Sequence, residues 1–278
     1  MRQLKYYLIF SFILLIGCEE FIEPNADQFI VEGFIVAGEP VDNIKIKESL
    51  PIDIDTIADL PISNADVVLS GPNGDVTLSY DPTTGKYFDP TFEFSIESGK
   101  EYELLINVVG TVATSKTIIP EQPDGISTSK NKLVVPNLVL TFGLGERITK
   151  LFDEERITLT WQPETGRSYY VVIESLEDEI DPILPEGIPG DSRRLLSSFR
   201  FVSEPSEITT FEIIGVALET YGKHVAKVYS VNQEYSDLFN SAAQDSRDLN
   251  EPPSNINNGL GIFSGFAVAT IEFEVARF

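Results

Sequence analysis

The stretch DVVLSGPNGDVTLSY, residues 66–80, decides the fold class. Two runs rich in β-branched and aromatic residues, 66–70 and 76–80, flank a segment of turn-forming residues, and such runs favour the half-buried surface of a β-sheet. Asn73 and Gly74 can supply the positive φ angles that a two-residue hairpin turn requires. The stretch therefore predicts two antiparallel strands joined by a tight turn.

The same alternation of strand-like runs and turns extends to both sides. Residues 29–36 and 101–108 are again β-branched and aromatic, and the turn glycines are Gly74, Gly85, Gly99 and Gly110, spaced by 11, 14 and 11 residues. Short strands interrupted at that interval are typical of a sandwich or barrel. Residues 28–119 are therefore predicted to form an all-β sandwich, immunoglobulin-like or transthyretin-like.

A break in the pattern separates a second β-rich region. Pro120, Pro123 and Gly125 interrupt the strands, so residues 120–155 are interpreted as a linker that includes the first strand of a second domain. We expect residues 156–278 to form a second sandwich in tandem with the first.

The sole tryptophan indicates the kind of sandwich. Strict alternation places Trp161 on one face with Ile157 and Leu159, and residues 168–174 form a following strand. This pair resembles the B and C strands of fibronectin type III domains, in which a Trp fills the core. Trp161 is therefore expected to pack in the core of a fibronectin type III-like sandwich.

One short helix is expected inside the second domain. Tyr235, Leu238, Phe239 and Ala242 recur at intervals of three and four residues, which predicts an amphipathic helix over 233–247. Pro252 and Pro253 then forbid its continuation. A last alternating strand is expected over 267–278.

The N-terminus has the layout of a secretory signal. Arg2 and Lys5 precede an apolar stretch at 6–16 that is too short to span a bilayer, so residues 1–17 are interpreted as a signal peptide. The motif that follows, Leu15, Ile16, Gly17 and Cys18, resembles the bacterial lipobox. That resemblance implies acylation of Cys18, by palmitate or a similar chain, and residues 18–27 would then form the lipidated tether.

The charge of the chain excludes nucleic acid as a partner. Twenty Lys and Arg residues stand against 44 Asp and Glu residues, a formal charge of −24, and no run supplies the clustered cations that bind phosphates. Loss of residues 1–17 removes Arg2 and Lys5 and no acid, so the charge becomes −26. An acidic body is repelled by an anionic membrane surface, and the lipid must therefore provide the anchoring.

Few residues offer catalytic or metal chemistry. His224 is the one histidine and has no Ser or Cys nucleophile at a recognisable spacing, so it is interpreted as a surface or turn histidine. Glu177, Asp178, Glu179 and Asp181 carry oxygen ligands that suit Ca²⁺, but they lack the spacing of a calcium loop. A solvated acidic loop is predicted, with a Ca²⁺ site as the alternative, and no cofactor is expected.

Four other features are candidates for a structural or a binding role. Asp53 and Asp55 share a face if the chain is extended there, and residues 178–194 form the best partner-binding loop. The glycine-rich stretch 257–265 is expected to let the backbone pass close to the helix, with ligand binding as the alternative. Three aromatic residues have two interpretations, either packing in the core or stacking on sugars and peptides. They are Tyr87, Phe88 and Phe92.

Several short motifs together carry a family resemblance. They are the lipobox, residues 31–33, residues 63–67, residues 85–87, Tyr102 and residues 255–263. With these motifs the chain resembles a Bacteroidetes lipoprotein family catalogued as domain of unknown function 4249 (DUF4249). The resemblance implies an outer-membrane lipoprotein, often encoded beside a TonB-dependent transporter, and it brings no catalytic signature. Acidic residues after Cys18 resemble the signal for export to the cell surface.

These observations predict a non-enzymatic binding or accessory module. The expected partners are the membrane, a TonB-dependent transporter and an unidentified small-molecule, glycan or peptide ligand. Two alternatives stay open: a hydrolase whose carboxylates converge between the two domains, and a structural or adhesive component of the cell envelope.

Overall fold

The computed structural model describes residues 29–49, 60–135, 156–179, 181–183, 202–215, 218, 220–242 and 253–277. Its elements in chain order are β1 (Phe29–Val36), β2 (Ile44–Glu48), β3 (Asp66–Gly71), β4 (Gly74–Asp81), β5 (Lys86–Phe88), β6 (Glu101–Val108), β7 (Thr111–Ile118), β8 (Ser127–Thr128), β9 (Lys132–Val135), β10 (Arg156–Thr160), β11 (Ser168–Ser175), β12 (Thr210–Ile214), β13 (Gly222–Val231), α4 (Gln233–Ala242) and β14 (Leu260–Arg277). The predicted all-β fold with one short helix is confirmed for these residues.

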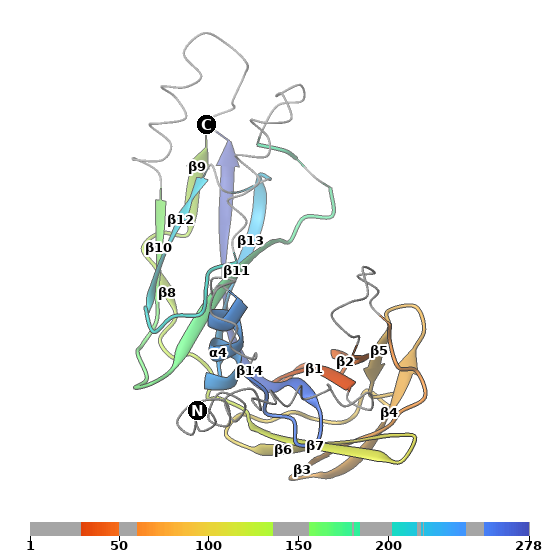
Figure 1. The fold of residues 1–278 in the computed structure, drawn as a ribbon. Coiled ribbons are helices and arrows are strands. Elements are labelled where there is room, and N and C mark those ends of the chain that lie inside the picture. The colour runs from red at the N-terminus through yellow and green to blue at the C-terminus, as the bar shows by residue number, and fades with distance from the viewer. Residues whose placement is uncertain are drawn as a thin grey trace, which may run out of the picture.

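The strands form two sandwiches set at an angle to each other (Figure 1). The main sheet has the order β11-β13-β14-β1-β2-β5-β4-β3-β6-β7, with β9 paired to β14, and a smaller sheet has the order β12-β10-β8. Strands β1 to β7 fold over one core, and the main sheet's β11, β13 and β9 pack against the smaller sheet over another. The long strand β14 runs from one sandwich into the other.

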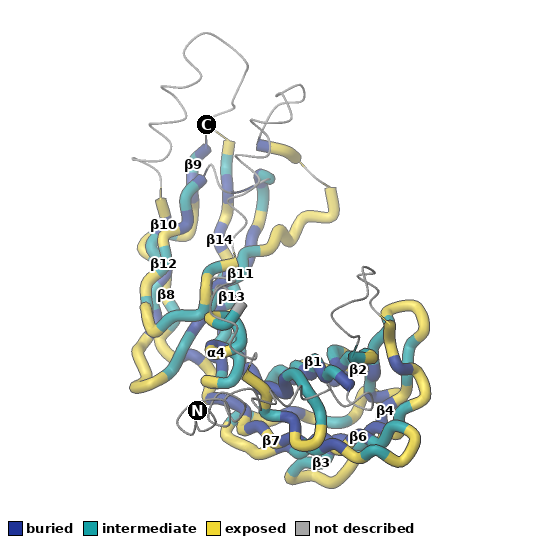
Figure 2. Tube along the Cα trace, in the orientation of Figure 1, coloured by how far each residue is buried: buried dark blue, intermediate teal, exposed yellow. Residues whose placement is uncertain are grey.

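Alternation along the strands explains the first core. In β1 every second residue is buried, from Phe29 through Val31 to Ile35, and β6 buries Tyr102, Leu104 and Ile106 in the same way. A period of two matches the pleat of a strand, in which successive side chains point to opposite faces. Figure 2 shows dark-blue buried segments along the strands of both sandwiches, with yellow exposed residues mainly in the connecting loops.

Trp161 occupies the second core, as the alternation predicts. It is buried together with Ile157 and Leu159, and its ring meets that of Tyr169 edge-on at 5.6 Å. Tyr169 lies on β11, the strand that follows in sequence, so the tryptophan joins the smaller sheet to the main one.

The first hairpin forms with its turn shifted by one residue. Gly71 pairs with Gly74, so the two-residue loop is Pro72–Asn73 rather than the predicted Asn73–Gly74. Gly74 has a φ of 116° and begins β4. The rigid φ of Pro72 suits the first turn position, which explains the shift.

Strand β14 changes the predicted division into domains. Its residues 260–266 pair in parallel with β1, and residues 266–275 pair antiparallel with β13. The first half therefore completes the first sandwich, although the sequence assigned all of residues 156–278 to the second. A strand of 18 residues is about 60 Å long, enough to enter both cores.

Helix α4 follows β13 directly and ends in the described residues at Ala242. The predicted continuation to residue 247 lies outside the described residues. Within the described part of the chain, no helix has both the length and the apolar character needed to cross a membrane.

Candidate functional site

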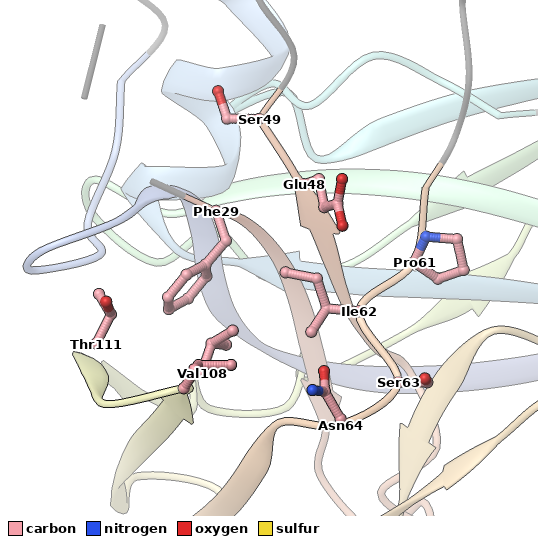
Figure 3. Close-up of a pocket in the computed structure, with 10 residues that line it drawn as sticks. Phe29, Glu48, Ser49, Pro61, Ile62, Ser63, Asn64, Val108 and Thr111 are labelled. Carbon is pink, nitrogen blue, oxygen red and sulfur yellow. The ribbon is translucent and has the colours of Figure 1, made fainter. Parts of the chain in front are cut away.

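A hollow of about 890 Å³ opens at the end of the first sandwich where β1 begins (Figure 3). The ends of β1 and β2 supply Phe29 and Glu48, and the β6–β7 hairpin supplies Val108 and Val109. The loop before β3 contributes residues 61–64. Four separate segments of the chain thus meet around one concave surface.

The floor of the hollow is apolar. Phe29 and Ile62 are buried members of the first core, and Val108 packs against that core. In Figure 3 the side chains of Phe29, Ile62 and Val108 point toward one another. Such a floor favours a ligand with an apolar face, because contact removes both surfaces from water.

Tyr87 holds the loop that closes this floor. Its hydroxyl donates to the carbonyl of Ile62 at 2.8 Å and accepts the amide of Ala65 at 3.0 Å. Burial raises the pKa of Tyr87, so the hydroxyl stays protonated and keeps donating. Tyr87 is therefore a core residue rather than a stacking platform. Of the other two aromatic candidates, Phe88 is half-buried and Phe92 is exposed, with their rings 5.9 Å apart.

The rim of the hollow is polar. Ser63, Asn64 and Glu48 are exposed there, and Thr111 adds a hydroxyl. Among the described residues of the lining, Glu48 is the only charged one, so these residues present hydrogen-bonding groups and a negative charge above an apolar floor. This combination is typical of small-molecule sites, in which a few polar groups orient a ligand.

A smaller hollow of about 440 Å³ lies where the two sandwiches meet. Gln122 and Val268 line it, and the Gln122 side-chain amide donates to the Val268 carbonyl at 2.8 Å. Among the described lining residues, Glu97 is the one carboxylate, and it accepts a hydrogen bond from Asn73 at 2.7 Å. The hydrolase alternative requires two carboxylates close together. The described residues that line this hollow do not supply such a pair.

The acidic run does not gather into a metal site. Glu177 accepts the amide of Lys223 at 2.7 Å, and Asp181 forms an ion pair with Arg277 at 2.6 Å. Among the residues that the structure describes, no group of three or more His, Cys, Asp and Glu side chains could hold a metal ion. Glu177 and Asp181 instead tie this loop to β13 and β14. Asp178 and Glu179 are exposed.

His224 is buried, which corrects its interpretation as a surface or turn residue. It lies inside β13 with 3% of its surface exposed and stacks on Phe273 with ring centroids 5.5 Å apart. Its Nε2 is 3.2 Å from the Thr220 hydroxyl and its Nδ1 is 3.2 Å from the Gly222 carbonyl. Burial lowers the pKa of His224, so the ring is neutral in the folded protein.

This burial predicts a loss of stability in mild acid. Below pH 6.5 the unfolded chain protonates His224 while the folded chain does not, so the free energy of unfolding falls as the pH drops toward the lowered folded pKa. One such group contributes a slope of at most about 1.4 kcal/mol per pH unit. Urea unfolding between pH 7 and 5.5 should show a steeper loss for the native chain than for His224→Gln. Equal losses would show that His224 does not titrate differently in the two states.

The glycine-rich stretch 257–265 serves the packing of β14 against β1. Gly261 has a φ of 102° and lies so close to Val31 that a Cβ would overlap the Val31 carbonyl. Gly265 approaches the backbone of Ile119. The predicted close approach is therefore to β1 and to the end of β7 rather than to the helix.

Asn255 locks the same stretch in place. Its side chain accepts the amide of Phe263 at 2.9 Å and donates to the Phe263 carbonyl at 2.7 Å, as a neighbouring strand would. Phe263 is fully buried in the first core. The structural interpretation of this stretch thus has a physical basis in the described contacts.

An aromatic cluster joins the sandwiches, and the sequence did not indicate it. Tyr170 and Tyr229 stack with ring centroids 4.7 Å apart, and Tyr235 of α4 meets Phe266 at 4.9 Å and Phe34 at 5.8 Å. These residues come from β11, β13, α4, β14 and β1. Strand alternation places Tyr170 and Tyr229 on the outward face of their strands, and this was the one sequence feature that could have indicated the cluster. The contacts within the cluster stabilise the orientation of one sandwich relative to the other.

Several predicted residues lie outside the described part of the chain. They are the lipobox residues Leu15, Ile16, Gly17 and Cys18, the pair Asp53 and Asp55, and residues 184–194 of the long loop. Their interpretations stay predictions.

Comparisons with known proteins give a family but no activity. No curated protein matches the chain. Among 85 matching chains of known structure is that of the chicken CNTN1 FN1-FN3 domains, with 11% sequence identity and a TM-score of 0.21. That match covers 90% of this chain and 65% of the CNTN1 chain, so this chain spans less than two thirds of its length. The family model described as "Domain of unknown function (DUF4249)" matches residues 19–272. The chain therefore belongs to the DUF4249 family, as its motifs indicated.

Proposed function

We propose that this protein is a lipid-anchored outer-membrane lipoprotein, exposed at the cell surface, that acts as a non-enzymatic binding module for a TonB-dependent transporter. The observation that carries the proposal is the hollow of about 890 Å³ at the start of β1. Its size lies within the roughly 300–1,000 Å³ of typical ligand sites.

The lining of the hollow defines the class of ligand. Phe29, Ile62 and Val108 provide an apolar floor, while Asn64 and Glu48 provide hydrogen-bonding groups at the rim. A ligand with one apolar and one polar face satisfies both parts, as glycan and peptide fragments do. The carboxylate of Glu48 disfavours an anionic ligand because like charges repel at close range.

The anchor gives the binding module its location. Cys18 ends the lipobox motif, and this motif supports Cys18 as the first residue of the mature chain. Two or more acyl chains anchor a protein stably where one gives only marginal binding. A tethered module raises the effective concentration of its ligand beside a transporter in the same membrane.

Two measurements on the full lipidated protein test this function. Purification from detergent-solubilised outer membranes should recover a TonB-dependent transporter in stoichiometric amount. Mass spectrometry of the compounds released on denaturation should detect a ligand with the native chain. Ser63→Trp should abolish ligand recovery because the indole fills the hollow from its exposed rim.

Ser79→Trp is the matched control, because Ser79 is an exposed serine of β4 outside the lining of the hollow. This variant should release as much ligand as the native chain. Recovery of the protein as a monomer without a transporter would refute the accessory role, and equal ligand recovery from both tryptophan variants would refute the hollow as the binding site.

A further inference from the structure

The tip of the β6–β7 hairpin has an unusual residue in its turn. Two residues, Val109 and Gly110, connect the strands, and both have positive φ angles of 49° and 92°. The side chain of Asn107 supports the turn by accepting the Gly110 amide at 3.0 Å. Turns of this type favour Asn or Asp at the first position, and a β-branched residue with positive φ is a genuine outlier.

The stability of the hairpin does not explain why a valine occupies position 109. Val109 as a residue is 88% exposed, so it adds almost no buried apolar surface to the protein. Its backbone conformation costs free energy that Asn would largely avoid, because a short polar side chain tolerates the left-handed region. Valine at this position therefore weakens the turn without strengthening the core, which points to a contact made outside the described molecule.

The tip half of the hairpin is also free of charge. Residues 104–115 contain no Asp, Glu, Lys or Arg, in a chain of which 23% is charged. The other end of the hairpin is charged, since Lys116 pairs with Glu101 at 3.2 Å and with Glu103 at 3.3 Å. On the tip half, Val112 is 45% exposed beside Val109. The tip half of the hairpin is thus an uncharged part of an acidic protein, with the carboxylates of Glu48 and Asp66 beside it.

The tether to the lipid enters at this same end. Phe29 and Val109 line one hollow, and the Phe29 carbonyl lies beside Gly259, whose neighbour Asn258 donates to the Val112 carbonyl at 2.8 Å. Cys18 precedes Phe29 by eleven residues, which span at most about 40 Å when fully extended. The tip therefore lies at the same end of the first sandwich as Phe29, the first described residue after the predicted tether.

We propose that the β6–β7 tip, with Val109 and Val112, inserts into the interfacial region of the membrane to which Cys18 is anchored. This inference rests on the proposed function, because the anchor supplies the membrane. An acidic surface is repelled by anionic lipids, and the uncharged tip is the surface that can approach them. Val109 also lines the hollow, so insertion fixes the hollow beside the bilayer.

Site-specific labelling tests the insertion. Cys18 is the only cysteine and is blocked by its acyl chain when lipidated, so Val109→Cys creates one free thiol for a polarity-sensitive dye. Ile118→Cys is the matched control, because Ile118 is a 57% exposed apolar residue at the charged end of the same hairpin. Both full-length lipidated proteins are placed in vesicles of phosphatidylethanolamine and phosphatidylglycerol, with and without a nitroxide-labelled lipid.

The two labels should respond differently. A dye at residue 109 should shift to the blue, and its fluorescence should fall about twofold with nitroxide lipid, since inserted groups lie roughly 5–10 Å into the interface. The dye at residue 118 should respond as in water. If both dyes respond as in water, or both as in lipid, the insertion is overturned. In that case, flotation of both proteins with the vesicles still supports the anchor. Failure of both proteins to float would refute the anchor and with it the insertion.

Discussion

Cys18→Ala is expected to move the protein from the membrane fraction to the soluble fraction. The resemblance to the lipobox assigns the anchor to this one residue, and the mature chain, at −26, has no electrostatic attraction to an anionic bilayer. Each buried CH₂ of an acyl chain contributes about 0.8 kcal/mol to membrane binding, so the loss of the acylation cannot be offset by a few exposed valines. Immunoblots of separated membrane and soluble fractions measure the change.

A second variant separates anchoring from surface export. Replacement of Glu19 and Glu20 by alanine leaves Cys18 in place and should keep the protein in the membrane, while its exposure to protease added to whole cells should fall. Retention of Cys18→Ala in the membrane fraction would disprove the lipid anchor. Unchanged protease exposure of the glutamate variant would disprove their role in export.

Gly261→Ala is expected to destabilise the protein by about 3–5 kcal/mol, a range reserved for substitutions that disrupt the core or backbone. Gly261 pairs with Val31 where β14 joins β1, and its Cβ would overlap the Val31 carbonyl. The backbone of β14 and the backbone of β1 cannot move apart to make room for the Cβ without breaking the pairing of the two strands. Folded proteins have about 5–15 kcal/mol of stability in total, so the variant would lose a large share of its stability.

Gly74→Ala is the matched control for this substitution. Gly74 also has a positive φ, 116°, but nothing lies within 4 Å of its added Cβ. Only the conformational cost of about 1–2 kcal/mol should remain there. Urea unfolding of the two variants measures the difference. Equal destabilisation would show that close packing does not require Gly261, and the ligand-binding interpretation of residues 257–265 would regain support.

Local patterns predicted the elements well because they depend on neighbouring residues. Alternation placed Trp161 in a core with Ile157 and Leu159, and the spacing of Tyr235, Leu238 and Phe239 predicted α4. Turn chemistry predicted the hairpin of β3 and β4 but placed its turn one residue too late. Both the strand period and the helix period are properties of a short segment of backbone, so a single sequence can reveal them.

The candidate site could not be predicted in the same way. Its floor joins Phe29 of β1, Val108 of β6 and Ile62 of the loop before β3, and only the tertiary structure brings these segments together. The sequence singled out none of these three residues, because each is an ordinary apolar residue in its own segment. It singled out Glu177 and Asp181 instead, and the structure commits each to another partner.

The sequence by itself determined the all-β class, the positions of most strands, the family and the predicted anchor at Cys18. Tertiary structure alone decided that β14 belongs to both sandwiches, that His224 is buried on Phe273, and that an uncharged hairpin tip lies beside the start of β1. The physical reason is the range of the interactions. Strand formation is set by neighbours along the chain, whereas the pairing of residues 30 and 260 depends on how two distant strands share one core.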